Sequence, residues 1–202
     1  MKKIAIIGGC GHVGIPLGLA LASRGFPTTL IDMNAEAVET IRSGRLPFHE
    51  EGAQEILNET LGNTLQVTTE PTGAASCDAL IFVIGTPVDE HMNPCVNEVM
   101  KTIESYIPFM ADEQLVVMRS TLYPGTFRII ERMLHNAGKK TRLAFCPERI
   151  LQGKGITEIF QLPQIVSGNS PEALEAAKSI FSRLTETLIE ATPEEAELAK
   201  LM

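Results

Sequence analysis

The stretch GGCGHVG, residues 8–14, decides the fold of this chain. It lies between two apolar runs, IAII at residues 4–7 and IPLGLALA at residues 15–22. A buried strand, a glycine-rich turn and a helix in this order bring backbone N–H groups close to a bound phosphate. The start of the sequence therefore predicts an α/β unit with a phosphate site at its turn.

Composition narrows the class of protein. The chain has 202 residues, of which 44% are hydrophobic and 21% charged, enough for one large domain or for one domain and the start of another. Its net charge of −8 argues against nucleic acid or an anionic membrane surface as a partner. No apolar run approaches the roughly 20 residues of a membrane span. The four cysteines form no C-x-x-C pair, so we expect reduced thiols, no metal site and a cytoplasmic location.

Short apolar runs alternate with helix-length amphipathic stretches along the chain, which predicts a doubly wound, mainly parallel α/β sheet of the Rossmann type. Strands are expected at residues 4–7, 28–31, 65–68, 79–84, 115–118, 142–145, 164–166 and 186–189. Helices are expected near residues 12–24, 35–43, 50–59, 95–106, 124–137, 171–184 and from 193 onward. Ser170 and Thr192 each precede a proline and are predicted N-caps.

The glycine-rich turn is compatible with two spacings. Gly9-x-Gly11-x-x-Gly14 is typical of dehydrogenases that bind a dinucleotide, and the spacing from Gly8 to Gly11 to Gly14 is typical of nucleotide-sugar epimerases and short-chain reductases. Asp32 ends the second expected strand, where a carboxylate accepts hydrogen bonds from the adenosine ribose. A carboxylate would repel a 2′-phosphate there, so Asp32 favours NAD over NADP.

The epimerase spacing requires a second motif, a Tyr-x-x-x-Lys pair that moves the proton. Tyr106 is followed four residues later by Met110, and Tyr123 by Phe127. We therefore interpret the turn as the dinucleotide motif of Gly9, Gly11 and Gly14.

Further polar stretches follow expected strands, at the edge where open α/β sheets bind ligands. GTPVDE at 85–90 contains Thr86, RSTLYPGT at 119–126 contains Ser120 and Thr121, and CPERILQGKG at 146–155 contains Glu148, Arg149 and Lys154. The stretch 34–52 ends in a Pro-Phe-His-Glu turn. Their placement after successive strands predicts one shared site.

These motifs carry a resemblance to a known family. GCGHVGIPL, IDMN, SGRLPFHEEG, GTP, STLYPGT, CPER, PQIVSG and AELAKLM occur in the order and spacing of the N-terminal half of the UDP-glucose/GDP-mannose dehydrogenase family. The resemblance implies an enzyme that oxidises the C6 alcohol of a nucleotide sugar to a carboxylate with two NAD⁺. It implies a homodimer for the full-length enzyme and a UDP-sugar as substrate.

The resemblance also assigns residues. It implies a cofactor site of Gly9, Gly11, His12, Val13, Gly14, Asp32, Thr86 and Thr121. It implies catalytic roles for Thr121, Glu148 and Lys200, and substrate contacts for Arg149 and Ile150. His12 stands where the family usually has a tyrosine.

Two features of the sequence indicate the kind of substrate. The sequence PERI with Gly153 and Lys154 is closer to the branch that oxidises UDP-N-acetylhexosamines, of the mannosamine or glucosamine type. Gln152 stands where the glucose branch has a second glutamate. The alternatives are a UDP-glucose-type enzyme of the same family, a non-catalytic NAD-binding module, and a 3-hydroxyacid or 6-phosphogluconate-type dehydrogenase.

The last stretch, TPEEAELAKLM at 192–202, has strong signals for a helix start and none for a helix end. We expect residues 1–191 to form the NAD-binding domain and residues 192–202 to begin a central connecting helix that is cut short. The family's nucleophilic cysteine and its UDP-binding domain have no counterpart in these residues. The piece is therefore expected to be inactive alone.

Overall fold

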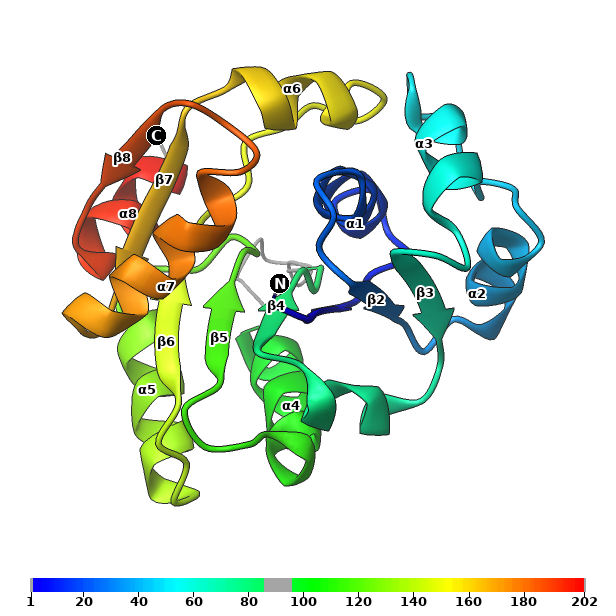
Figure 1. Ribbon diagram of the computed structural model, residues 1–202. Coiled ribbons are helices and arrows are strands. Elements are labelled where there is room, and N and C mark those ends of the chain that lie inside the picture. The colour runs from blue at the N-terminus through cyan, green and yellow to red at the C-terminus, as the bar shows by residue number, and fades with distance from the viewer. Residues whose placement is uncertain (1, 86–95, 202) are drawn as a thin grey trace, which may run out of the picture.

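A twisted sheet forms the centre of the computed structural model, which describes residues 2–85 and 96–201 (Figure 1). Within these residues eight strands are hydrogen-bonded in the order β3-β2-β1-β4-β5-β6-β7-β8. Their bounds are β1 Ile4–Ile7, β2 Thr28–Ile31, β3 Leu65–Thr68, β4 Ala79–Phe82, β5 Leu115–Met118, β6 Arg142–Phe145, β7 Gln164–Gly168 and β8 Leu188–Glu190. The first six strands in this order, from β3 through β1 to β6, pair in parallel. Strand β7 is antiparallel to β6, and β8 is parallel to β7. The predicted doubly wound, mainly parallel sheet is confirmed.

Helices cover both faces of the sheet. Their bounds are α1 Gly14–Ser23, α2 Ala35–Arg42, α3 Ala53–Thr60, α4 Val96–Tyr106, α5 Thr126–Asn136, α6 Gly155–Gln161, α7 Pro171–Phe181 and α8 Pro193–Leu201, with two short 3₁₀ helices, Pro71–Ser76 and Ile107–Phe109. Helices α1, α2, α3, α6 and α7 contribute to one apolar cluster, and α4, α5 and α8 to the other. Figure 1 shows α1, α3 and α6 on the side of the sheet opposite α4 and α5.

Successive side chains of a strand point to opposite faces of the sheet, which explains why there are two apolar clusters. In β1, Ile4 and Ile6 belong to the first cluster, while Ala5 and Ile7 belong to the second. A strand that is apolar on both sides is expected when helices cover both faces of a parallel sheet.

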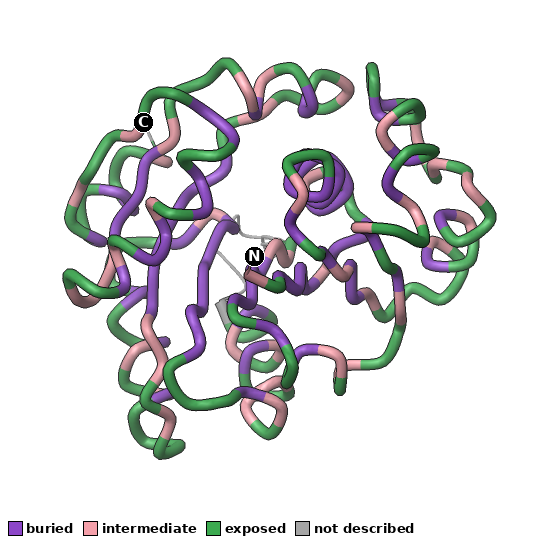
Figure 2. Tube along the Cα trace, in the orientation of Figure 1, coloured by how far each residue is buried: buried purple, intermediate pink, exposed green. Residues whose placement is uncertain are grey.

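Helix α1 is buried from Gly14 to Ala22, because it packs between the sheet and helices α3 and α6 (Figure 2).

The predicted N-caps are also confirmed. The Ser170 hydroxyl accepts a hydrogen bond from Ala173 N (3.2 Å) at the start of α7. At the start of α8, Glu195 N donates to the Thr192 hydroxyl (3.3 Å), and Thr192 N donates to the Glu195 carboxylate (2.8 Å). This reciprocal pair is a capping box, which satisfies amide groups that a helix start leaves without partners.

The topology determines where the site lies. From β1 the chain proceeds through β2 to β3, and then crosses to β4, β5 and β6 on the other side of β1. A ligand crevice is expected outside the carboxyl ends of β1 and β4, where the strand order reverses. The segments that follow β1, β2, β5 and β6 therefore share one edge of the sheet, and they contain the predicted site residues.

Candidate functional site

The glycine turn after β1 combines tight packing with an open position. A Cβ atom on Gly14 would lie 2.5 Å from the carbonyl oxygen of Gly9, and one on Gly9 would lie 2.8 Å from the carbonyl oxygen of Ile6. At Gly11 the nearest atom is Gly8 O at 3.7 Å, so this position faces open space. Two glycines thus bring the helix against the strand, and the middle one leaves room for a ligand. Gly8 is needed for another reason, since its φ of +77° favours glycine.

Asp32 lies at the end of β2, beside this turn. One of its carboxylate oxygens accepts a hydrogen bond from Cys10 N (2.9 Å), and the other accepts one from Asn34 N (3.0 Å). The carboxylate is half-buried. Each oxygen has a further lone pair that can accept from a hydroxyl group, so the ribose of a dinucleotide fits this position.

The start of α1 supplies the phosphate side. Helix α1 begins at Gly14, and its N-cap residue, Val13, has no polar side chain to bind the first free amides. Gly11 and His12 are exposed, and the His12 ring lies against the Phe48 ring with 3.9 Å between centroids. The free amides and the positive end of the helix dipole suit a pyrophosphate.

The segments after β4 and β5 approach one another at the same edge. The Ser120 hydroxyl donates a hydrogen bond to Ile84 O (2.5 Å). Thr121, predicted to belong to the cofactor site, is half-buried in this segment. Thr86, predicted for the same role, lies outside the described residues.

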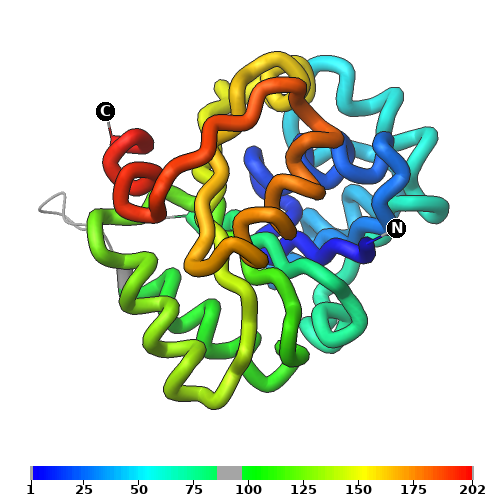
Figure 3. Tube along the Cα trace, turned by 60° about the vertical axis from the view of Figure 1, so that its left-hand side comes forward, coloured from blue at the N-terminus to red at the C-terminus, as the bar shows by residue number. Residues whose placement is uncertain are grey.

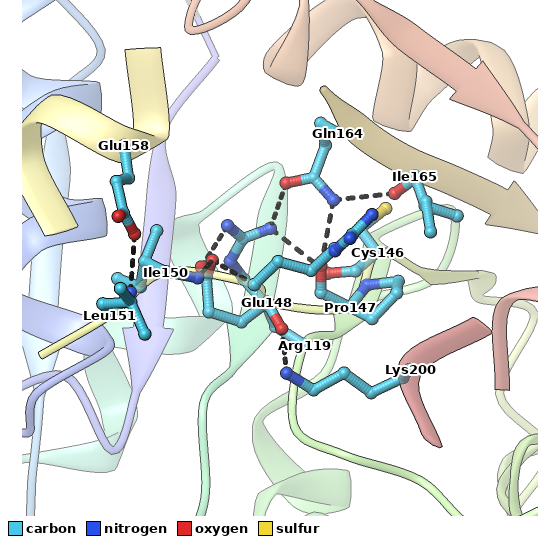
Figure 4. A network of polar contacts seen from close by, with 11 residues as sticks. Arg119, Cys146, Pro147, Glu148, Ile150, Leu151, Glu158, Gln164, Ile165 and Lys200 are labelled. Atoms are coloured by element: carbon cyan, nitrogen blue, oxygen red, sulfur yellow. Dashed lines mark hydrogen bonds and ion pairs between the residues drawn. The ribbon is translucent and has the colours of Figure 1, made fainter. Parts of the chain in front are cut away.

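A buried ion pair connects the ends of β5 and β6 (Figure 4). The Arg119 guanidinium, with its side chain 2% exposed, donates to the carboxylate of Glu148, to Gln164 Oε1 (2.7 Å) and to Cys146 O (3.2 Å). Its Nε has no hydrogen-bond partner among the described residues. The other oxygen of Glu148 accepts from the next two amides, those of Arg149 (2.6 Å) and Ile150 (3.0 Å). The carboxylate is therefore fully engaged by its own loop and by Arg119.

Lys200 reaches this pair from α8. Its Nζ donates a hydrogen bond to the backbone carbonyl of Glu148, although the two residues are 52 positions apart (Figure 4). Burial lowers the pKa of Lys200 below its ordinary value; the Glu148 charge opposes this shift, and Arg119 and Arg149 add to it. The structure thus brings together Glu148 and Lys200, two of the three predicted catalytic residues.

The two predicted substrate residues have different environments. Arg149 is exposed in the segment after β6, at the rim of the site. Ile150 packs partly against the first apolar cluster, and its Cδ1 lies 2.8 Å from where a Cβ on Gly155 would be. Direct substrate contact by Ile150 stays a prediction.

Sequence reasoning missed four polar residues around the site: Arg119, Gln164, Glu50 and Glu197. The carboxylate of Glu50 is buried and accepts from Gly153 N (3.1 Å) and Ile156 N (3.3 Å), which holds the loop after β6. A charged residue directly after the apolar run LVVM was the available signal for Arg119. The partners of the two glutamates lie far away in the sequence, and no local pattern indicates them.

Burial disfavours the thiolate form of the three cysteines among the described residues, Cys10, Cys77 and Cys146, whose pKa values it raises. Burial raises the pKa of Cys146 to about 12, and burial together with the Asp32 charge raises that of Cys10 to about 12. Such thiols stay protonated at neutral pH. Over residues 2–85 and 96–201 we find no group of three or more metal-ligating side chains. No helix in this part of the chain is long and apolar enough to cross a membrane.

The glycine turn, the carboxylate after β2 and the strand order define a class, the Rossmann-type dinucleotide-binding domain. The family model "UDP-glucose/GDP-mannose dehydrogenase family, NAD binding domain" matches residues 2–185. The chain belongs to this family, and its cofactor is NAD. The resemblance inferred from the motifs is confirmed.

Several similar proteins are nucleotide-sugar dehydrogenases. A UDP-N-acetyl-D-mannosamine dehydrogenase of Methanococcus maripaludis is 33% identical over 208 residues, covering 100% of this chain and 47% of the relative. The structure of a UDP-D-ManNAc dehydrogenase from Pyrococcus horikoshii has a TM-score of 0.93 at 26% identity, covering 99% of this chain and 49% of that one. The structure of the UDP-N-acetyl-mannosamine dehydrogenase Cap5O from Staphylococcus aureus has a TM-score of 0.91 at 27% identity, covering 100% of this chain and 50% of that one. The chain spans about half the length of the relatives that it matches.

Proposed function

We propose that this chain is the cofactor-binding part of an NAD-dependent nucleotide-sugar 6-dehydrogenase, which oxidises the C6 alcohol of a UDP-N-acetylhexosamine to the uronate with two NAD⁺. One observation carries the proposal: Lys200 of α8 donates a hydrogen bond to the backbone carbonyl of Glu148, whose carboxylate pairs with Arg119, at the sheet edge that also holds the dinucleotide turn. A domain that only bound NAD would not need this second cluster. The names of the similar proteins support the same reaction class.

The chain's residues divide into cofactor and reaction groups. Asp32 would bind the adenosine ribose, and the amides around Gly11, His12 and Val13 the pyrophosphate. Thr121, with Thr86, would line the nicotinamide side. When bound, NAD⁺ supplies the acceptor for the hydride.

Lys200 has the properties of a proton-transfer group. Its lowered pKa makes the ammonium a better acid and increases the share of neutral amine that can accept a proton. In the ammonium form it would also stabilise negative charge on the C6 oxygen. The Glu148 carboxylate would assist by holding its own loop through the amides of Arg149 and Ile150, and with it the Glu148 backbone carbonyl to which Lys200 donates.

Arg149 supports the acetylhexosamine branch. Its exposed guanidinium at the rim suits the oxygens of a nucleotide sugar, beside Ile150. Gln152 in place of a second glutamate removes a carboxylate that the glucose branch carries. A cytoplasmic location and a homodimer of the full-length enzyme stay part of the proposal.

The test compares substrates in the full-length enzyme that contains this chain. We expect kcat/KM to be highest for a UDP-N-acetylhexosamine, and Arg149→Ala to raise KM for that sugar about tenfold while leaving KM for NAD⁺ unchanged, as loss of one charge-assisted contact predicts. Arg132→Ala is the matched control, since Arg132 is exposed on α5 away from the rim. Highest kcat/KM for UDP-glucose would show that the branch assignment is wrong.

A further inference from the structure

Helix α8 is held by a buried carboxylate. Among the described residues the buried acidic side chains are Glu50, Glu148 and Glu197, and Glu197 is only 1% exposed. One of its oxygens accepts a hydrogen bond from Gly125 N (2.7 Å), and the other accepts one from Phe127 N (2.8 Å). A buried carboxylate is costly unless such donors satisfy it, so this contact is specific in geometry.

The two donors are the amide of the N-cap of α5 and the second amide inside that helix. Gly125 is the N-cap of that helix, with a φ of +90° that favours glycine. The helix dipole adds a favourable field for a negative charge at this end. Glu197 therefore supplies the cap of α5 from a different helix, and Figure 3 shows α8 beside the start of α5.

Apart from the hydrogen bond of Lys200 to the Glu148 carbonyl, the other contacts of α8 are less specific. Glu194 forms an ion pair with Arg128 (2.8 Å), but both side chains are about half exposed, at 51% and 50%, and such pairs contribute little. Pro193 and Ala196 are buried through apolar contacts, which do not determine the rotation of a helix as closely as two directional hydrogen bonds do. Beyond that exposed pair, the directional contacts of α8 with the rest of the described chain are therefore those of Glu197 and Lys200, and only that of Glu197 is made by a fully buried side chain with two hydrogen bonds.

Lys200 follows Glu197 by one turn of α8. Side chains three positions apart lie on the same face of a helix, so fixing Glu197 against α5 directs Lys200 toward the carbonyl of Glu148. We propose that Glu197 is a positioning residue, which sets the place of the Lys200 ammonium and also holds the segment after Thr121 through Gly125. Its consequence for catalysis rests on the function proposed above, but the positioning itself does not.

The positioning is tested on the 202-residue chain by NMR. In Glu197→Gln we expect the amides of Gly125 and Phe127 to exchange about tenfold faster with solvent, the change in an opening equilibrium that loss of ~1.4 kcal/mol gives. The pKa of Lys200, followed at its side-chain carbon, should rise toward its ordinary value as the amine leaves its half-buried place beside Arg119, Arg149 and Glu148. Glu194→Gln is the matched control on the same helix and should change neither quantity.

Two further measurements keep the outcomes separate. If circular dichroism shows that Glu197→Gln does not fold, Glu197→Asp replaces it; this variant keeps the charge but is one methylene too short, and the same two changes are expected. A folded variant with unchanged Lys200 pKa and unchanged exchange would overturn the positioning role. In the full-length enzyme, Glu197→Gln should lower kcat about tenfold with KM for NAD⁺ unchanged. Full activity of Lys200→Met would contradict the proposed function and leave the positioning result standing.

Discussion

Asp32 shows how one residue selects a cofactor. Both of its oxygens are already oriented by backbone amides, those of Cys10 and Asn34, before a ligand is present. A preorganised carboxylate binds a ribose hydroxyl without loss of side-chain freedom on binding. The same charge opposes a phosphate on that ribose.

Replacing Asp32 by alanine should therefore narrow the preference for NAD⁺ over NADP⁺. We expect NAD⁺ binding to weaken by roughly 1.5–3 kcal/mol, the contribution of a hydrogen bond to a charged group, and NADP⁺ binding to change less. Calorimetric titration of the 202-residue chain measures both. Asp112→Ala, an exposed change before β5, is the control that should leave both affinities unchanged. Tighter binding of NADP⁺ by the unmodified chain would contradict the role of Asp32.

At the scale of elements, strands were easier to predict than helix α6. The eight expected strands all occur, because each is an apolar run bounded by polar residues. Helix α6 was missed, since its seven residues are too few to display a period. It is stabilised from outside: Glu50 binds Ile156 N in the first turn of α6 and Gly153 N just before it.

Glu50→Gln is expected to loosen α6 and the loop before it. The amide side chain can accept through one oxygen only, so one buried N–H loses its partner, and the free energy of unfolding should fall by about 1–3 kcal/mol. Urea unfolding measures this loss. Glu51→Gln, the exposed neighbour, is the matched control and should leave the stability unchanged. Equal stabilities of the two variants would show that the Glu50 contacts contribute nothing.

For the whole molecule, the sequence predicted which segments lie at the same edge of the sheet, but it did not predict which side chains form hydrogen bonds or ion pairs there. Parallel strands bring their carboxyl ends to one edge, so the segments with Asp32, Thr121 and Glu148 were expected to lie at the same edge of the sheet. The partners of Arg119 and Glu197 depend on side-chain directions after the helices have packed. Only the resemblance placed Lys200 in the predicted site, because 52 positions separate it from Glu148, whose carbonyl it contacts.

A polypeptide of residues 1–202 is expected to bind NAD⁺ without oxidising a nucleotide sugar. The turn and Asp32 supply groups suited to a pyrophosphate and a ribose, so NAD⁺ at about a hundred times its Kd should stabilise the fold by ~2.7 kcal/mol and raise Tm. The resemblance implies a cysteine thiolate for the second oxidation, whereas burial raises the pKa of Cys10 and Cys146 to about 12 and raises that of Cys77 above its ordinary value. The relatives have about as much chain again beyond the matched half. Absorbance at the NADH band, with UDP-N-acetylhexosamine and NAD⁺ present, should therefore stay flat, while the melting curve shifts upward. NADH formation by this polypeptide that disappears in Lys200→Met would show instead that residues 1–202 hold a sufficient catalytic set.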